Sequence, residues 1–264
     1  MKRVLTILAF SMVMFSCSRN AITGRNQLSL VSENDLQAMA LTQYRDFLSK
    51  SSVVNSGSDA EMVRRVGSRI ATAVRQYYSD HGLPHALDNY NWEFNLVNNK
   101  QVNAWVMPGG KVVVYTGLLP VAQTETALAI VLGHEITHAV VGHGKERMSQ
   151  QLAAQGLGAL GGAALGTNTQ AANIFNTVYG VGAEYGVLLP YSRKQETEAD
   201  KYGLIFAAAA GYDPRLAIDF WTRMANMSNG SKPPPFMSDH PSDQQRIEDI
   251  RGFIPEALKY YRGK

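Results

Sequence analysis

One helix constrains this chain more than any other feature. Residues Thr126–Met148 form an apolar, helix-periodic segment that contains His134-Glu135-Ile136-Thr137-His138. On a helix, His134 and His138 lie one turn apart on the same face, about 6 Å from each other, and can bind one tetrahedral zinc ion. Glu135 lies beside the open coordination position, where it can take a proton from a water molecule. Because the flanking residues are apolar, the segment predicts a buried helix that carries most of a metal site.

The residues just after this motif do not supply a third ligand. The alternative to a metal site is a pair of core histidines, but chance gives this pentapeptide in only about half a percent of chains of this composition. Metzincin-type zinc peptidases need Gly and His at the eighth and eleventh positions, which hold Val141 and Gly144 here. His143, at the tenth position, points about 140° away from His138 on a continuous helix. We therefore expect His143 at a helix end or behind the ligands. Since Cys17 belongs to the N-terminal segment, the third donor should be a carboxylate.

An acidic helical segment, Ser192–Asp200, supplies that carboxylate 58 residues past His138. Glu196 and Asp200 are one helical turn apart and share a face. We expect Glu196 to bind the metal and Asp200 to accept the outer N–H of a ligating histidine, which fixes its tautomer. The alternative is a solvated acidic helix face. Glu198, about 200° around the helix from Glu196, is expected to play no part in the site.

The first 16 residues have the features of a signal peptide. Basic residues precede an apolar stretch about 12 residues long, which is too short to span a bilayer. Ser16 before Cys17 is typical of the cleavage box of bacterial lipoproteins, in which the cysteine is lipidated; the alternative is an ordinary secretory signal. We expect residues 17–31 to form a lipidated N-terminus and tether with a short packed segment, so that the membrane is a partner through Cys17.

Composition excludes several classes of protein. Because Cys17 is the only cysteine, the chain has no internal disulfide and no zinc–thiolate site. The chain holds 25 Lys and Arg against 22 Asp and Glu, and removal of Lys2 and Arg3 with the signal leaves a net charge of +1. That balance gives no nucleic-acid footprint.

Hydrophobic spacing predicts an α+β fold, with a small sheet in front of a mostly helical body. Helices are expected over Glu33–Leu48 and Asp59–Tyr78, the second capped by Asp59, and again over most of the chain after Thr124. The small-residue segment Gln155–Gly186 is expected to hold closely packed helices, with a mobile lid as the alternative. The predicted strands are Trp92–Val97, Val102–Val106 and Lys111–Thr116, with a turn at Pro108-Gly109-Gly110.

The motifs resemble those of the CAAX prenyl endopeptidase family, which also contains soluble bacterial periplasmic members and the mitochondrial Oma-type protease. The resemblance runs from about Ile22 to Ile250. Because the sequence has no spanning helices, it is similar to the soluble, compact gluzincin branch. The matching segments are His134–His138, Glu196–Asp200, Asn103-Ala104, Pro108-Gly109-Gly110, Ser192-Arg193, Asp239-His240-Pro241 and Arg246-Ile247.

The resemblance implies a single zinc metallopeptidase domain over residues 32–264, with the mostly helical body of a zincin (a minigluzincin). It implies one Zn²⁺ per chain and Glu135 as the general base. The implied zinc ligands are His134, His138 and Glu196.

The resemblance also implies that Val102–Val106 is an edge strand lining the active-site cleft. There Asn103 and Ala104 would contact the substrate backbone. An edge strand offers unpaired N–H and C=O groups that bind an extended peptide as an added strand. The alternative for Asn103 is a plain polar residue near a turn.

His240 and Arg246 have more than one interpretation. We expect a helix from Pro241 to about Phe253, with Arg246 about 9 Å along its axis from His240. His240 stands just before this helix, at the end of the stiff loop Ser231–Asp239 that contains Pro233–Pro235. In the family this pair lies beside the zinc, where both residues can donate hydrogen bonds to the oxyanion of the reaction. A neutral His240 can instead bind the open zinc position and hold the enzyme inactive. The plain alternative is a helix-start histidine and a surface arginine.

Together these features predict a zinc-dependent endopeptidase of the bacterial envelope, facing the periplasm and anchored to the outer membrane through Cys17. An edge-strand cleft binds backbone rather than long sequence motifs, so the expected substrates are unfolded or misfolded envelope proteins. The alternative is a chaperone or assembly factor, working with the envelope assembly machinery, whose zinc site is idle or structural.

Overall fold

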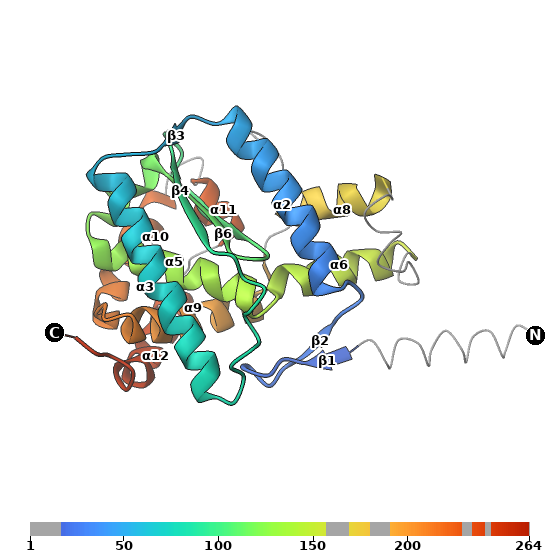
Figure 1. Ribbon diagram of the computed structural model, residues 1–264. Helices are drawn as coiled ribbons and strands as arrows, with labels where there is room; N and C mark the ends of the chain where they lie inside the picture. Colours follow the sequence, from blue (N-terminus) through green and yellow to red (C-terminus); the bar gives the residue numbers. More distant parts are fainter. Residues whose placement is uncertain (1–16, 157–168, 180–190, 229–233, 241–243, 264) are drawn as a thin grey trace, which may run out of the picture.

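A four-stranded sheet lies at the centre of the fold (Figure 1). The computed structural model describes residues 17–156, 169–179, 191–228, 234–240 and 244–263. The strands stand in the order β3 (Val53–Val54), β4 (Glu93–Val97), β6 (Lys111–Tyr115) and β5 (Ala104–Met107). β4 and β6 run parallel, and the other two pairs are antiparallel.

The three predicted strands are confirmed to within two residues, and β5 lies at the sheet edge, as the resemblance implied. The sequence pattern does not predict β3. The turn from β5 to β6 is tight because Gly109 and Gly110 take φ angles of 80° and 83°. This left-handed region is open to glycine without a steric penalty.

Helices cover both faces of the sheet. On one face lies α2 (Glu33–Lys50), which shares a buried cluster with Val113. On the other lie α3 (Ser58–Asp80) and α5 (Glu125–Val140), in a cluster with Val112. Successive residues of β6 therefore face opposite cores, and all five residues of this strand are buried.

Both N-terminal helices are confirmed, but one predicted cap is wrong. α2 begins after Ser32, whose side chain accepts a hydrogen bond from the Asp35 backbone N–H. α3 begins after Gly57 and has no side-chain cap, so Asp59 lies inside the helix. The turn before α3 takes φ = 97° at Gly57, which favours glycine over a capping side chain there.

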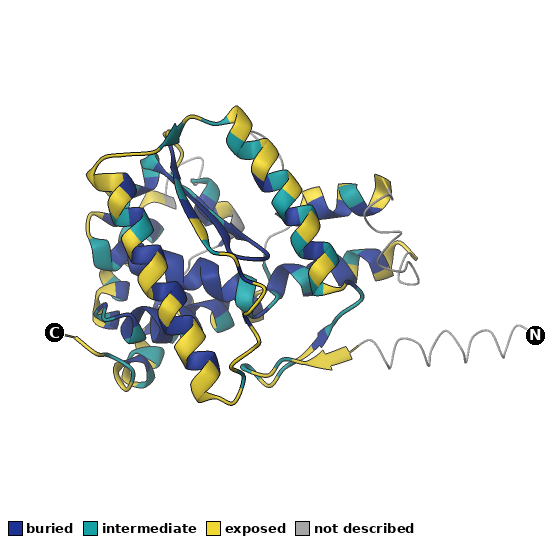
Figure 2. Ribbon diagram, viewed as in Figure 1, coloured by how far each residue is buried: buried dark blue, intermediate teal, exposed yellow. Residues whose placement is uncertain are grey.

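The helix with the histidine pair ends earlier than predicted. In place of one helix over Thr126–Met148, α5 stops at Val140, and α6 (His143–Ala154) starts after Gly142. The break occurs because Gly142 adopts a left-handed φ of 76°, a conformation that ends helices. α5 is still buried along most of its length (Figure 2).

The rest of the described chain is mainly helical, as predicted. The part of Gln155–Gly186 that is described contains α8, which packs against α6; residues 157–168 and 180–186 lie outside the described residues, as does the expected signal peptide. The expected helix start at Pro241 also lies outside them. In the part of the chain that is described, no helix is both long and apolar enough to cross a bilayer. The remaining described helices are α4 (Leu119–Ala122), α8 (Thr169–Tyr179), α9 (Arg193–Ala209), α10 (Ala217–Ser228), α11 (Pro235–Asp239) and α12 (Gln244–Leu258), with short 3₁₀ turns at Thr116–Leu118 and Pro214–Leu216.

The N-terminal hairpin, residues 17–28, packs against the helical body. β1 (Cys17–Arg19) and β2 (Asn26–Leu28) pair antiparallel. The side-chain amides of Asn20 and Gln27 both donate to the Val141 carbonyl, at 2.9 and 3.1 Å, just past the end of α5. Much of the expected tether is therefore part of the folded body, while Cys17 itself is exposed.

Two glycines allow α5 and α9 to approach closely. A Cβ on Gly133 would lie 2.5 Å from the Gly203 carbonyl oxygen, and a Cβ on Gly203 would lie 2.7 Å from the His134 backbone nitrogen. Contacts this short with backbone leave no room for a methyl group. The spacing of the two helices that carry the candidate site is thus set by these glycines.

We expect Gly203→Ala to lower the free energy of unfolding by about 3 kcal/mol, the upper part of the usual range for overpacking, because backbone on both sides must shift. Denaturant unfolding of the metal-free protein measures this. Gly252→Ala is the matched control, since a Cβ there meets nothing within 4 Å on helix α12; it should raise stability by about 0.5 kcal/mol. Equal effects of the two substitutions would contradict the close approach.

Candidate metal centre

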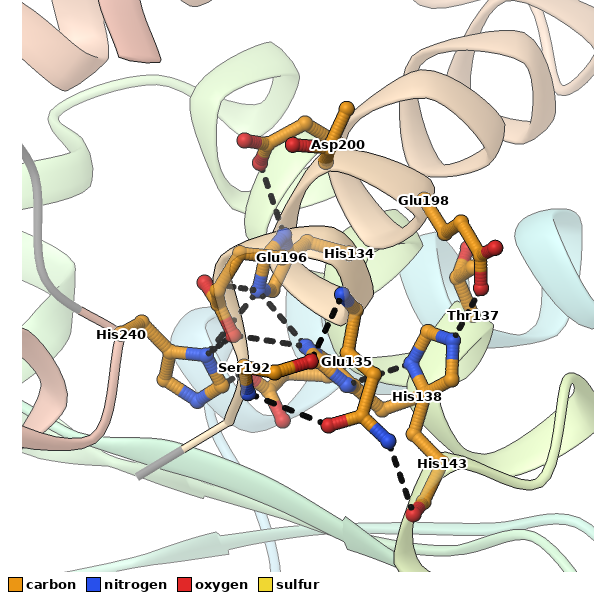
Figure 3. Close-up of polar contacts among 12 residues, drawn as sticks. His134, Glu135, Thr137, His138, His143, Ser192, Glu196, Glu198, Asp200 and His240 are labelled. Atoms are coloured by element: carbon orange, nitrogen blue, oxygen red, sulfur yellow. Dashed lines mark hydrogen bonds and ion pairs between the residues drawn. The ribbon is translucent and has the colours of Figure 1, made fainter. Parts of the chain in front are cut away.

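Two imidazoles from α5 and one carboxylate from α9 face one another in the interior (Figure 3). The Nε2 atoms of His134 and His138 are 3.1 Å apart. Glu196 places Oε1 3.3 Å from Nε2 of His138 and Oε2 3.6 Å from Nε2 of His134. All three side chains are buried. The structure thus brings together the three residues predicted as ligands.

These distances fit a tetrahedral metal ion. Nitrogen and oxygen ligands about 2.0–2.1 Å from a tetrahedral zinc lie about 3.3 Å from one another. The two imidazole nitrogens are 3.1 Å apart, and each lies 3.3 or 3.6 Å from one of the two Glu196 oxygens, close to that spacing. His240 adds a fourth ligand atom, and all four lie within 4.8 Å of one another. Among the described residues, this is the group of His, Cys, Asp and Glu side chains that can hold a metal ion.

The protonation states also suit metal binding. Burial lowers the pKa of His134 and His138, so both imidazoles are neutral and have a free lone pair. Burial alone would raise the pKa of Glu196, but the positive charges of His240 and Arg246 outweigh it and hold that pKa well below its ordinary value. Neutral imidazoles and an ionised carboxylate are the forms that bind a metal.

Asp200 lies behind the first histidine, as expected from its position one turn after Glu196. Its Oδ1 is 2.9 Å from Nδ1 of His134. The neutral His134 therefore carries its proton on Nδ1 and directs Nε2 toward the centre of the cluster. Burial would raise the pKa of Asp200, but the charge of Arg246 and the bond to His134 outweigh that effect and lower the pKa below its ordinary value, so the carboxylate stays ionised.

Arg246 supports the acidic residues from α12. It donates from Nε and Nη2 to Asp200, both at 2.8 Å, and from Nη1 to the His240 carbonyl at 3.0 Å. Nη1 is also 3.1 Å from Glu196. The guanidinium stacks 3.7 Å above the Trp221 ring, so Arg246 is a buried residue of the site and not a surface arginine.

Glu135 and His240 lie on the same side of the cluster. Nδ1 of His240 is 2.9 Å from Oε1 of Glu196 and 3.1 Å from Nε2 of His134. Nε2 of the same ring is 3.3 Å from Oε1 of Glu135. The charges of Glu196 and Glu135 raise the pKa of His240 to about 9, against the lowering effect of burial. His240 therefore bridges the metal-binding group and Glu135.

One expectation about α9 needs correction. Glu198 points away from the metal-binding group, as the helical angle requires, but it is not an isolated surface residue. Its Oε2 is 2.9 Å from Nε2 of His143, and Nδ1 of His143 is 2.9 Å from Nδ1 of His138. The break at Gly142 brings His143 back against His138, which a continuous helix would not do.

Sequence reasoning missed two aromatic residues at the site. Tyr191 lies over His138 with ring centroids 3.8 Å apart, and Arg147 lies 4.2 Å above the Tyr191 ring. Trp221 packs edge-on against His134 with centroids 5.7 Å apart. No local pattern identifies these residues, because each reaches the histidines from a different helix or loop.

The edge strand β5 runs beside α5. Ala104 is buried and pairs with Val114 of β6, and the Asn103 carbonyl accepts from the Tyr115 N–H at 3.0 Å. The Val102 carbonyl accepts a long bond of 3.4 Å from Phe236, at the start of the segment that leads to His240. A role of Asn103 and Ala104 in substrate binding remains a prediction.

A helix with two histidines four residues apart, packed against a second helix whose glutamate faces them, is typical of a zincin-type metallopeptidase fold. Comparison with known families supports this reading. The chain belongs to peptidase family M48, whose model matches residues 60–254. M48 peptidases depend on a metal ion, and the cluster of His134, His138 and Glu196 can hold one.

Curated relatives come from mitochondria and from bacteria. The chain is 37% identical over 172 residues to the mitochondrial metalloendopeptidase OMA1 of Schizosaccharomyces pombe, which covers 65% of this chain and 49% of the relative. It is 35% identical over 179 residues to human metalloendopeptidase OMA1, and the match covers 66% of this chain and 34% of the human protein. It is 34% identical over 167 residues to the beta-barrel assembly-enhancing protease of Yersinia pestis, and the match covers 61% of this chain and 34% of that protein. The chain thus spans about half the length, or less, of these relatives.

Proposed function

We propose that this chain is a zinc-dependent endopeptidase of the bacterial cell envelope. The observation that carries the proposal is the tetrahedral spacing of His134, His138 and Glu196, with Glu135 next to the ligands but outside the metal-binding group. A base beside a metal site with an open position is what peptide hydrolysis requires.

Each residue has a distinct task. When bound, Zn²⁺ polarises the scissile carbonyl and makes a water molecule more acidic. Glu135 takes the proton of that attacking water and later delivers it to the leaving amine. The edge of β5 holds the substrate backbone through Asn103 and Ala104. Because the Nε, Nη1 and Nη2 groups of Arg246 already donate to its neighbours, we assign it to holding Asp200 and Glu196 in place rather than to the oxyanion.

Unfolded or misfolded envelope proteins are the proposed substrates. An edge strand such as β5 can pair with any extended backbone, which favours unfolded chains over folded ones. Two relatives of similar sequence carry the name beta-barrel assembly-enhancing protease, which supports a place in the envelope and contact with its assembly machinery. Lipidation at the exposed Cys17 would anchor the chain to the outer membrane, facing the periplasm, after removal of residues 1–16.

A casein assay tests the proposed activity. The purified protein should cleave casein at internal bonds, lose that activity in a metal chelator and regain it with added zinc. A chaperone or assembly factor with an idle zinc site would instead suppress aggregation of an unfolded client without producing fragments. Binding of casein without any cleavage in the zinc-loaded protein would overturn the proposal.

Zinc binding would displace the proton that His240 carries beside Glu196 and Glu135, and the neutral ring is then expected to close the open metal position in the resting protein. Its Nδ1 lies within 3.1 Å of atoms of both Glu196 and His134, the place of a fourth ligand. His240→Ala should therefore raise basal cleavage, by about 10-fold if the open form makes up about a tenth of the molecules. The initial rate of casein cleavage at saturating zinc measures this. A fall of about 10²–10³-fold would show instead that His240 donates to the oxyanion.

A further inference from the structure

The two histidine ligands are supported on their outer nitrogens in different ways. His134 contacts a carboxylate directly, through the 2.9 Å pair of its Nδ1 with Asp200. Among the residues that the structure describes, none places a carboxylate against Nδ1 of His138. Its Nδ1 meets Nδ1 of His143 at 2.9 Å, and the other nitrogen of His143 meets Oε2 of Glu198 at 2.9 Å (Figure 3). A second imidazole thus stands between His138 and its acidic partner.

Only one arrangement of protons satisfies both contacts when His138 binds the metal through Nε2. The proton of His138 is then on Nδ1 and is donated to Nδ1 of His143. His143 must carry its own proton on Nε2, which it donates to Glu198. A proton on Nδ1 of His143 would set two N–H donors against each other at 2.9 Å, so the contact itself requires this arrangement.

The chain of contacts ends at the N-terminal hairpin. Arg25 donates from Nε to Oε1 of Glu198 at 2.8 Å, and its two terminal nitrogens form a bidentate pair with Glu146 at 2.5 and 2.7 Å. Glu146 also accepts from Gln195 at 2.9 Å. Arg25 and Glu198 are largely buried, with side-chain exposures of 12% and 14%. Charge-assisted bonds in such a setting fix direction as well as supply energy.

We propose that Arg25, Glu198 and His143 form a positioning relay for the metal ligand His138, which makes the N-terminal hairpin a part of the metal centre's support. The relay rests on the proposed function only in that His138 is a ligand. It does the work for His138 that Asp200 does for His134, across one more ring. Supports of this kind orient a ligating histidine and make it a better ligand.

Zinc affinity and histidine tautomers test the relay without reference to peptidase activity. Glu198→Gln, which is nearly the same shape, and Glu198→Ala should weaken zinc binding by about 10–100-fold in competition with a chelating dye, as Asp200→Asn should. Arg25→Ala should weaken it by less, and Arg25→Lys should recover part of the loss. In the zinc-loaded protein, long-range ¹H–¹⁵N spectra should show the His143 proton on Nε2 in the parent and lose that preference in Glu198→Ala.

The Arg65–Glu125 pair provides the matched control. It also joins an arginine to a glutamate across two elements, with a 2.7 Å contact between α3 and the start of α5, but it touches none of the histidines. Arg65→Ala should leave zinc affinity unchanged. Zinc affinity in Glu198→Gln equal to the parent, or an equal loss in Arg65→Ala, would overturn the relay. A parent protein that binds zinc with the expected tautomers but cleaves nothing would refute the proposed function and leave the relay standing.

Discussion

Glu135→Gln is expected to keep its metal and to lose at least about 100-fold in the rate of peptide cleavage. The glutamine has the same shape but cannot take a proton, and removal of a general base has effects of about 10²–10⁴-fold. The metal should stay because Glu135 lies outside the group formed by His134, His138, Glu196 and His240. Elemental analysis gives the zinc content, and cleavage of a quenched fluorescent peptide gives kcat.

Glu125→Gln is the control for this substitution on the same helix. Glu125 lies in the first turn of α5, nine residues before His134, where it pairs with Arg65 and accepts from the Tyr212 hydroxyl at 2.8 Å. That variant should retain nearly the full rate. Loss of zinc from Glu135→Gln would show that this residue is a ligand and not the base.

The local patterns of two helices suffice to predict the heart of the site. The four-residue spacing in His134–His138 and in Glu196–Asp200 puts each pair on one helix face, and the structure brings those faces together. Such predictions work because α-helical geometry is set by the backbone and does not depend on distant partners. The family resemblance added the position of β5 at the sheet edge, which periodicity alone does not give.

The contacts behind the metal ligands that the sequence did not predict depend on the turn at Gly142 and on residues far apart in the chain. His143 lies at a helix end and behind His138, as predicted, but its contact with His138 arises because the left-handed Gly142 ends α5, which an unbroken helix would not allow. The bond of Arg25 to Glu198 joins residues 173 positions apart, and no spacing rule links them. The support of the metal ligands is thus tertiary, while the ligands themselves are encoded locally.

Glu196→Ala is expected to abolish zinc binding, the largest effect on the metal centre. Glu196 supplies the only negative charge in the four-residue group, which otherwise consists of His134, His138 and His240. The Arg246 guanidinium lies 3.1 Å from a Glu196 oxygen and therefore close to the metal position. Without Glu196, no carboxylate ligand would offset the repulsion between Arg246 and a divalent cation. Zinc per chain should fall from about one to near zero after dialysis, as elemental analysis would show.

Thermal unfolding gives a second measure of the same loss, because a metal that binds only the folded state stabilises it by mass action. At a zinc concentration about 1,000 times the Kd, this amounts to about 4 kcal/mol, and the difference between the Tm in zinc and in chelator should disappear in Glu196→Ala. The control is Glu248→Ala on α12, whose side chain is half exposed and pairs with Arg251 at 2.8 Å; it should keep the full zinc-dependent shift. Glu196 could not be the third ligand if Glu196→Ala kept both its zinc and that shift. The metal would then have to be held by the three histidines, with His240 as a permanent ligand in place of a removable one.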